Sequence, residues 1–223
     1  MTQSLVETLA EFQAKRALTM PADKLKINVD QRRLLVEMAD RAGFVKPGDV
    51  VPPFELTEVD EGKLTLPALL ENGPVVLIFF RFAGCPACNV ALPYYRDHLA
   101  DRLAALGATL VGVSPQVPEK LRDIKERHAL GFSIATDEGN ALARRFGILY
   151  TFDEASRRSS LKSGSPIGEV TGTGTWELPM PTAVVIDREG IVRFADVSPD
   201  WLVRTEPDVI VDAVRNIYLN AAA

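Results

Sequence analysis

Cysteine is scarce in this sequence, with two residues among 223 that stand three positions apart. So few cysteines exclude a fold stapled by several disulfides, and in a reducing compartment such a close pair is rarely structural. Histidine is equally scarce, and only His98 and His128 are present. A zinc site needs about four ligands. His128 falls on the apolar stripe of a predicted helix, which favours a packed core residue, so we expect no metal.

Basic residues are outnumbered by acidic ones, 25 to 30, which gives a net charge of -5. No basic surplus is available to neutralise phosphates, and no basic amphipathic segment suits an anionic membrane. The longest apolar run, 75–80, is far shorter than the roughly 18 residues of a membrane span. A positively charged leader and an apolar stretch before Glu7 are also missing. We therefore expect a cytoplasmic protein without nucleic-acid or membrane partners.

The composition is otherwise that of a globular chain, with 47% hydrophobic and 25% charged residues. Residues 1–43 predict a helical hairpin, whose first helix opens with a capping box at Ser4 and Glu7. The second helix is predicted to begin near Asn28 and to stop at Gly43. The apolar faces of this extension need a partner. That partner is either the main domain, 44–223, or a second subunit in a homodimer.

Strands and helices alternate from residue 46 onward. The final strands surround a predicted hairpin turn, and 151–175 is predicted as a long loop with one short helix. This alternation predicts an α/β fold with a mixed central sheet flanked by helices. The predicted strands are 75–80, 109–113, 132–135, 182–186 and 191–195, and the predicted helices are 86–106, 118–129, 140–146 and 206–219.

Cys85 follows a buried strand and directly precedes a helix, so it is predicted to cap the helix N-terminus. Pro86 then takes the first helical position, where its missing N–H group has no consequence. The free N–H groups and the helix dipole favour a thiolate. We therefore expect Cys85 to be the nucleophile. Cys88, one turn later and more deeply buried, is expected to be the resolving thiol.

Arg81 stands four residues before Cys85. It is a candidate stabiliser of the thiolate. In the alternative interpretation it is a strand-end arginine that extends its charged group to solvent. The sequence favours neither.

Cys85-Pro86-Ala87-Cys88, with Pro93 five residues later, resembles the thioredoxin motif. Met180-Pro181-Thr182 resembles the cis-proline loop of that fold. The resemblance implies a thioredoxin-like fold and a redox-active disulfide between Cys85 and Cys88. It also implies a cis bond before Pro181, with Met180, Pro181 and Pro86 contacting the substrate.

A wider resemblance covers 46–217 and points to the peroxiredoxin family, which is also called the alkyl hydroperoxide reductase/thiol-specific antioxidant family. It is carried by four segments, 46–56, 111–114, 136–140 and 184–190. Some positions depart from the pattern of peroxide-reducing members. Peroxide-reducing members carry a proline at the position of Ile78 and a threonine or serine at that of Phe82. They carry an arginine where this chain has Pro181. Thioredoxins in turn carry an acid and a tryptophan where this chain has Phe79 and Gly84.

The resemblance implies a cofactor-free, antioxidant thiol-dependent peroxidase that reduces hydrogen peroxide or alkyl hydroperoxides. Its disulfide would be reduced by a thioredoxin-type protein. Two alternatives stay open. The first alternative is a thiol–disulfide oxidoreductase that acts on protein or small-molecule disulfides. The second is a non-catalytic module that senses redox state or binds zinc.

Overall fold

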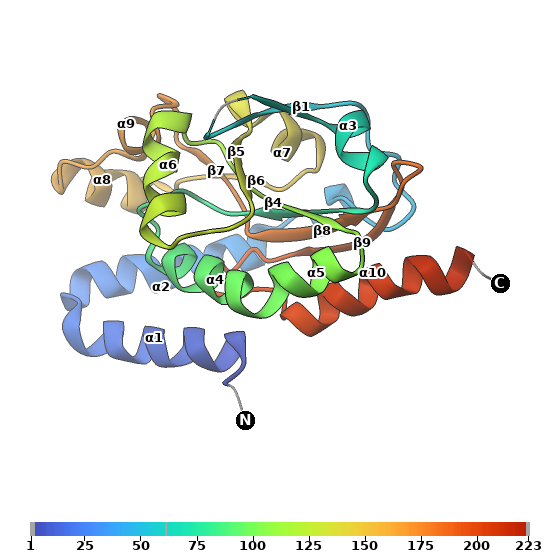
Figure 1. Ribbon diagram of the computed structural model, residues 1–223. Coiled ribbons are helices and arrows are strands. Elements are labelled where there is room, and N and C mark those ends of the chain that lie inside the picture. Colours follow the sequence, from blue (N-terminus) through green and yellow to red (C-terminus); the bar gives the residue numbers. More distant parts are fainter. Residues whose placement is uncertain (1–2, 61, 222–223) are drawn as a thin grey trace.

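The computed structural model describes residues 3–60 and 62–221 and shows a central sheet with helices on both faces (Figure 1). The strands are β1 (Glu55–Glu58), β2 (Lys63–Thr65), β3 (Val75–Phe79), β4 (Thr109–Ser114), β5 (Ser133–Thr136), β6 (Leu149–Thr151), β7 (Glu177–Pro179), β8 (Thr182–Ile186) and β9 (Val192–Val197). The helices are α1 (Leu5–Thr19), α2 (Ala22–Met38), α3 (Leu66–Glu71), α4 (Pro86–Tyr95), α5 (Asp101–Ala105), α6 (Pro118–Arg127), α7 (Ala141–Arg145), α8 (Glu154–Lys162), α9 (Ile167–Thr171) and α10 (Pro207–Ala221).

Seven strands form the main sheet in the order β2-β1-β5-β4-β3-β8-β9. β3 pairs in parallel with β4 and antiparallel with β8, so the sheet is mixed, as the sequence predicts. β3 is buried along its whole length. Its side chains alternate between two cores, with Val76 and Ile78 in one and Leu77 and Phe79 in the other. An unbroken apolar run is therefore the expected sequence for this strand.

The two faces of the sheet carry different helices (Figure 1). The core that contains the cysteines is shared with α4, α6 and α10, whereas α3 and α7 cover the opposite face. α4 continues through a π-helical segment, Arg96–Ala100, into α5. The predicted helix over 86–106 is therefore confirmed, with Pro93 inside it. The π-helical segment follows this proline, which lacks the N–H group of a regular helical turn.

The N-terminal helices pack on the main body. The capping box of Ser4 and Glu7 is confirmed, and Leu5 and Leu9 of α1 are buried in the same core as the cysteines. The predicted start of the second helix is wrong, because α2 begins at Ala22, directly after Pro21. Proline interrupts a helix but is tolerated just before the first turn of the next one, so α2 can begin directly after Pro21. The helix also ends earlier than predicted, and 41–43 is a short 3-10 turn. Residues 1–2 of the predicted extension lie outside the described residues.

The prediction of a long loop over 151–175 is wrong. This stretch holds α8 and α9, and β6 and β7 at its two ends form a small antiparallel sheet. The local signals are short ones. The Asp153 side chain caps α8 by accepting from the Ser156 N–H, and Pro166 precedes α9. Polar helices of this length have too little apolar periodicity to be recognised from sequence.

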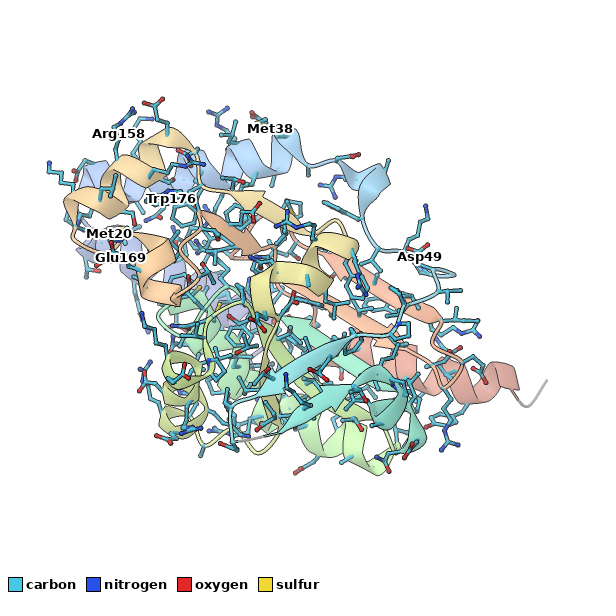
Figure 2. All side chains as sticks on the ribbon, turned by 90° about the horizontal axis from the view of Figure 1, so that it is seen from above. Met20, Met38, Asp49, Arg158, Glu169 and Trp176 are labelled. Atoms are coloured by element: carbon cyan, nitrogen blue, oxygen red, sulfur yellow. The ribbon has the colours of Figure 1, made fainter. Side chains whose placement is uncertain are left out.

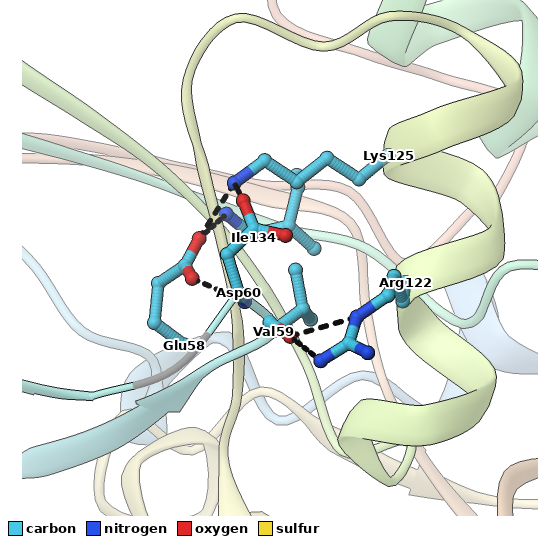
Figure 3. A network of polar contacts seen from close by, with 6 residues as sticks. All are labelled: Glu58, Val59, Asp60, Arg122, Lys125 and Ile134. Atoms are coloured by element: carbon cyan, nitrogen blue, oxygen red, sulfur yellow. Dashed lines mark hydrogen bonds and ion pairs between the residues drawn. The ribbon is translucent and has the colours of Figure 1, made fainter.

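Ionic contacts hold α6 against the end of β1 (Figure 3). Lys125 Nζ lies 2.7 Å from Glu58 Oε1, and both side chains are largely buried. Arg122 Nε donates to the Val59 carbonyl over 3.0 Å. These contacts fix α6 at the end of β1, where it also packs beside β5. Within the described residues no helix has the length and apolar character needed to cross a membrane.

Candidate active site

The segment 80–85 leaves β3 and delivers Cys85 to the N-terminus of α4. Cys85 is the N-cap residue in an extended conformation, and Pro86 occupies the first turn, as predicted. The Cys85 N–H donates to the Phe82 carbonyl over 3.1 Å, which closes the turn. The Cys85 side chain makes no capping hydrogen bond to this turn, although the Cys88 backbone N–H helps to lower the pKa of Cys85.

Side chains from distant segments hold this turn. Gln116 Oε1 accepts from the Ala83 N–H over 2.7 Å. Asn89 Nδ2 donates to the carbonyls of Ala83, over 2.7 Å, and Cys85, over 2.9 Å. His128 Nε2 lies 2.8 Å from Asn89 Oδ1. Sequence reasoning missed these contacts and assigned His128 to the core, whereas it is only partly buried.

Cys85 and Cys88 are unpaired thiols, and both are completely buried. The expectation that Cys88 would be the more buried of the two is therefore wrong. Gly84 and Pro86, on either side of Cys85, are both exposed. The nucleophile candidate thus lies directly beneath the surface, covered by its own turn.

Arg81 is brought to Cys85, with 3.9 Å between its Nη1 and the Cys85 sulfur. Its side chain is only 6% exposed, so the interpretation of an arginine extended to solvent is wrong. The guanidinium lies over four aromatic rings, which supply cation–π contacts. The distances to the ring centroids are 4.7 Å for Trp201, 5.6 Å for Phe82, and 5.9 Å for both Tyr150 and Phe152.

A second arginine, which the sequence did not single out, contacts the other cysteine. Arg204 Nη2 donates to the Cys88 sulfur over 3.6 Å, and the residue is buried. It comes from the loop between β9 and α10. No local motif marks it, because it reaches Cys88 only through the fold.

These surroundings separate the acidities of the two thiols. Burial raises the pKa of Cys85, but hydrogen bonding from Cys88 and the charges of the two arginines outweigh it, and the pKa falls to about 5. Burial, together with the adjacent Cys85, raises the pKa of Cys88 well above that of an ordinary thiol. The arrangement therefore provides one thiolate and one thiol at neutral pH.

The predicted cis bond before Pro181 is wrong, because this peptide bond is trans. The backbone here runs extended from β7 into β8. The Met180 N–H donates to the Ile148 carbonyl over 2.7 Å, and the Pro181 carbonyl accepts from the Ser198 N–H over 2.9 Å. Met180 packs with Tyr150 in an apolar cluster separate from the core that holds the cysteines.

The N-terminal helices close over Trp201, which in turn covers Arg81. Gln31 of α2 accepts from the Trp201 indole N–H over 3.0 Å and donates to Ser156 Oγ over 2.8 Å. Arg16 of α1 stacks over the same indole at 5.9 Å. The other tryptophan, Trp176, lies at the end of the molecule beside α8 and α9 (Figure 2). It packs against Phe152, itself part of the aromatic surround of Arg81.

No group of three or more potential metal ligands comes together in the described parts of the chain. The alternative in which the cysteines bind zinc therefore has no further cluster of ligands to support it in these parts of the chain.

Comparison with known proteins gives a consistent assignment. The sequence profile of the AhpC/TSA family matches residues 47–195. Peroxiredoxin Bcp of Escherichia coli K12 is 31% identical over 104 residues, which are 47% of this chain and 65% of that protein. The match thus spans slightly less than two thirds of the relative's length.

Solved structures share the fold. Peroxidoxin BcpB of Mycobacterium tuberculosis superposes with a TM-score of 0.61 at 26% identity, covering 78% of this chain and 98% of that one. A 2-Cys peroxiredoxin of Plasmodium vivax gives a TM-score of 0.60 at 15% identity, with 80% and 100% covered. The first 46 residues and the Arg204 loop lie outside the segment that matches the family profile.

Proposed function

The chain belongs to the AhpC/TSA family, and from that premise we propose that it is a thiol-dependent peroxidase. Its substrates are hydrogen peroxide or alkyl hydroperoxides. Cys85 is the nucleophile, Cys88 the resolving thiol and Arg81 the thiolate stabiliser. The relatives named as peroxiredoxins support the activity, and the site supports the roles.

The observation that carries the proposal is a buried thiolate beside a buried arginine. Cys85 has a pKa of about 5, so its sulfur is ionised at neutral pH although it is out of solvent. Arg81 Nη1, 3.9 Å away, supplies the compensating charge. A peroxide bound next to both groups would be attacked by the sulfur while the guanidinium stabilises the negative charge that develops on the leaving oxygen.

The reaction proceeds in two chemical steps. The Cys85 thiolate attacks one peroxide oxygen, the O–O bond breaks, and the leaving oxygen takes a proton to become water or an alcohol. The sulfur is thereby oxidised to a sulfenic acid. Cys88 then displaces the hydroxyl from Cys85, which gives a disulfide and a second water. An external dithiol of the thioredoxin type reduces that disulfide by thiol–disulfide exchange.

Burial favours peroxide over a protein disulfide as the oxidising substrate. A peroxide is a far smaller molecule than a protein disulfide, and attack on a disulfide of another protein would require an exposed Cys85 sulfur. The alternative of a thiol–disulfide oxidoreductase was supported by two motifs, the CxxC pair and the cis-proline loop. The second does not support it, since the bond before Pro181 is trans. The CxxC spacing at a helix N-terminus remains its support.

The partners follow from the proposed cycle and stay predictions. A thioredoxin-like reductant must reach the disulfide at the exposed Gly84–Pro86 surface. Four further points also stay predictions. They are the cytoplasmic location, a homodimer through the N-terminal helices, a domain boundary after residue 43, and substrate contacts by Met180, Pro181 and Pro86.

Trapping of the sulfenic acid tests the proposal. Cys88→Ser protein treated with one equivalent of hydrogen peroxide should form a dimedone adduct on Cys85, detected by mass spectrometry. Unsubstituted protein should instead lose two thiols and form no adduct. If Cys88→Ser yields no adduct while a disulfide substrate oxidises the unsubstituted protein, the oxidoreductase alternative replaces the peroxidase.

A further inference from the structure

Arg204 is a buried cation that donates a hydrogen bond to the sulfur of the resolving cysteine. Its Nη2 donates to Cys88 over 3.6 Å, and its Nη1 donates to the carbonyls of Trp201, over 2.6 Å, and Val203, over 2.7 Å. In residues 3–60 and 62–221 it forms no ion pair with a carboxylate. The guanidinium is only 6% exposed, contacts the Cys88 sulfur and lowers the pKa of Cys85, so its charge acts on the cysteine pair with little screening by water.

The charge that Arg204 faces changes during the proposed cycle. In the reduced protein Cys85 is the thiolate, and Arg204 lowers its pKa. Burial raises the pKa of Cys88, and the thiolate raises it further through the hydrogen bond between the two sulfurs and through its charge. Once Cys85 is a neutral sulfenic acid, the repelling charge is gone. Cys88 is then the nearest group on which Arg204 can stabilise a negative charge.

We propose that Arg204 is the catalytic residue of the resolving step, activating Cys88 only after Cys85 has been oxidised. The inference rests on the proposed peroxidase cycle and adds a second arginine to it. The two arginines act in different steps. Arg81 serves the attack on peroxide and Arg204 serves the closure of the disulfide. The order of the steps follows, because oxidation of Cys85 removes the repelling charge and leaves Arg204 to offset the effect of burial on Cys88.

The step balances without any further reagent. Cys88 loses its proton, and the thiolate displaces the hydroxyl group from the Cys85 sulfur. The S–S bond forms as the S–O bond breaks, and the departing hydroxide takes a proton to become water. Arg204 keeps its own proton throughout and contributes only charge and one N–H donor.

The pH dependence of this step reports on Cys88. The groups that face the cysteines come from several elements, namely Cys85 on α4, Arg81 after β3, Arg204 in the loop after β9, Tyr150 on β6 and Arg16 on α1. Burial raises the pKa of Tyr150 to about 12, so it stays neutral below pH 9. The arginines stay charged over the same range. Closure requires the Cys88 thiolate, so a change in the pH profile of the closure rate on substitution of Arg204 reports on the ionisation of Cys88.

Single-turnover oxidation separates the two steps. Reduced protein is mixed with one equivalent of hydrogen peroxide from pH 5 to pH 9, quenched by alkylation at set times, and analysed by mass spectrometry for sulfenic acid and disulfide. Arg204→Met removes the charge, and Arg204→Lys retains it. Arg32→Met is the matched control. Arg32 also lies over Trp201, at 5.6 Å, but is paired with Asp200 and contacts neither cysteine.

Loss of a hydrogen bond to a charged group should slow closure in Arg204→Met about 10- to 100-fold at pH 7, so that sulfenic acid accumulates. The midpoint of the closure rate should move to higher pH, and Arg204→Lys should restore part of both effects. Arg32→Met should close at the original rate. Sulfenic acid that forms rapidly and closes equally fast in Arg204→Met overturns the inference while leaving the peroxidase intact. If neither sulfenic acid nor disulfide forms in the unsubstituted protein, the peroxidase itself is wrong.

Arg204 also ties its loop to two carbonyls, so Arg204→Met is checked for folding by its melting temperature. Should it unfold, Arg204→Lys alone decides the question. Lysine keeps the charge but cannot reach Cys88 and both carbonyls together. A closure midpoint unchanged in a folded Arg204→Lys, together with an unchanged rate, contradicts a role for the guanidinium contact.

Discussion

Replacing Arg81 by methionine should raise the pKa of Cys85 and slow its reaction with peroxide. At 3.9 Å, a unit positive charge stabilises the thiolate by about 4 kcal/mol if the effective dielectric constant is about 20. That energy corresponds to about three pH units. The Cys88 hydrogen bond and Arg204 remain in the variant, so we expect a rise of between about one and three pH units from the present value of about 5.

The consequence at neutral pH follows from the fraction of thiolate. With a rise of about three pH units only about a tenth of Cys85 is ionised at pH 7, so the rate with peroxide falls about tenfold from this cause alone. Loss of the charge opposite the leaving oxygen adds to the decrease. The two effects separate if the rate is compared at equal thiolate concentration.

The assay is thiolate absorbance near 240 nm against pH, in a Cys88→Ser background so that one thiol is observed. Arg157→Met is the matched control, because Arg157 also lies over an aromatic ring, that of Trp176, but away from the cysteines. Arg81→Lys should give a smaller shift than Arg81→Met. A midpoint no higher in Arg81→Met than in the Cys88→Ser parent would refute the claim that Arg81 stabilises the thiolate.

Three further predictions concern stability. Because folding lowers the pKa of Cys85 to about 5, its stabilising contribution is present above the pKa of an unfolded thiol and is lost as the pH falls toward 5. The free energy of unfolding of the reduced protein, measured with urea, should rise by about 1.4 kcal/mol per pH unit between about pH 5 and pH 8, and Cys85→Ser should lack this rise. Gln31→Leu removes the acceptor for the buried Trp201 N–H and should lower the free energy of unfolding by about 1–3 kcal/mol; an unchanged urea midpoint would contradict a structural role for this contact. Gly147→Ala places a Cβ 2.1 Å from the Gly43 carbonyl oxygen at a φ of +68°, and should destabilise by more than about 2 kcal/mol. Gly174→Ala is the control, because its φ of +70° imposes the same backbone strain but no atom lies within 4 Å of the added Cβ. Equal losses of unfolding free energy in the two variants would show that the Gly43 carbonyl does not clash with the new Cβ.

Local signals in the sequence were sufficient to place the nucleophile candidate. The strand before Cys85 is an unbroken apolar run buried on both faces, and Pro86 marks the first helical turn. The capping box of α1 is equally local, since Ser4 and Glu7 are three residues apart. Features of this kind depend on neighbours in the chain, so they are readable before the fold is known.

The residues missed depend on contacts between distant segments. Arg204 is 116 positions from Cys88, and Trp201 is 170 positions from Gln31. No periodicity or motif records such pairs. The error at Pro181 has another cause. The cis bond was inferred from a resemblance to thioredoxins, whereas in this chain the extended pairing at Met180 and Pro181 keeps the bond trans.

The most direct test of the peroxidase is stopped-flow oxidation of the fully reduced protein by hydrogen peroxide, with Cys85→Ser as the control. We predict the loss of two thiols per peroxide, at a rate far above that of a small-molecule thiol at the same thiolate concentration, and no reaction in Cys85→Ser. A rate no greater than that of the free thiolate would contradict the account. Arg81 would then only ionise Cys85, without assisting its attack on a peroxide.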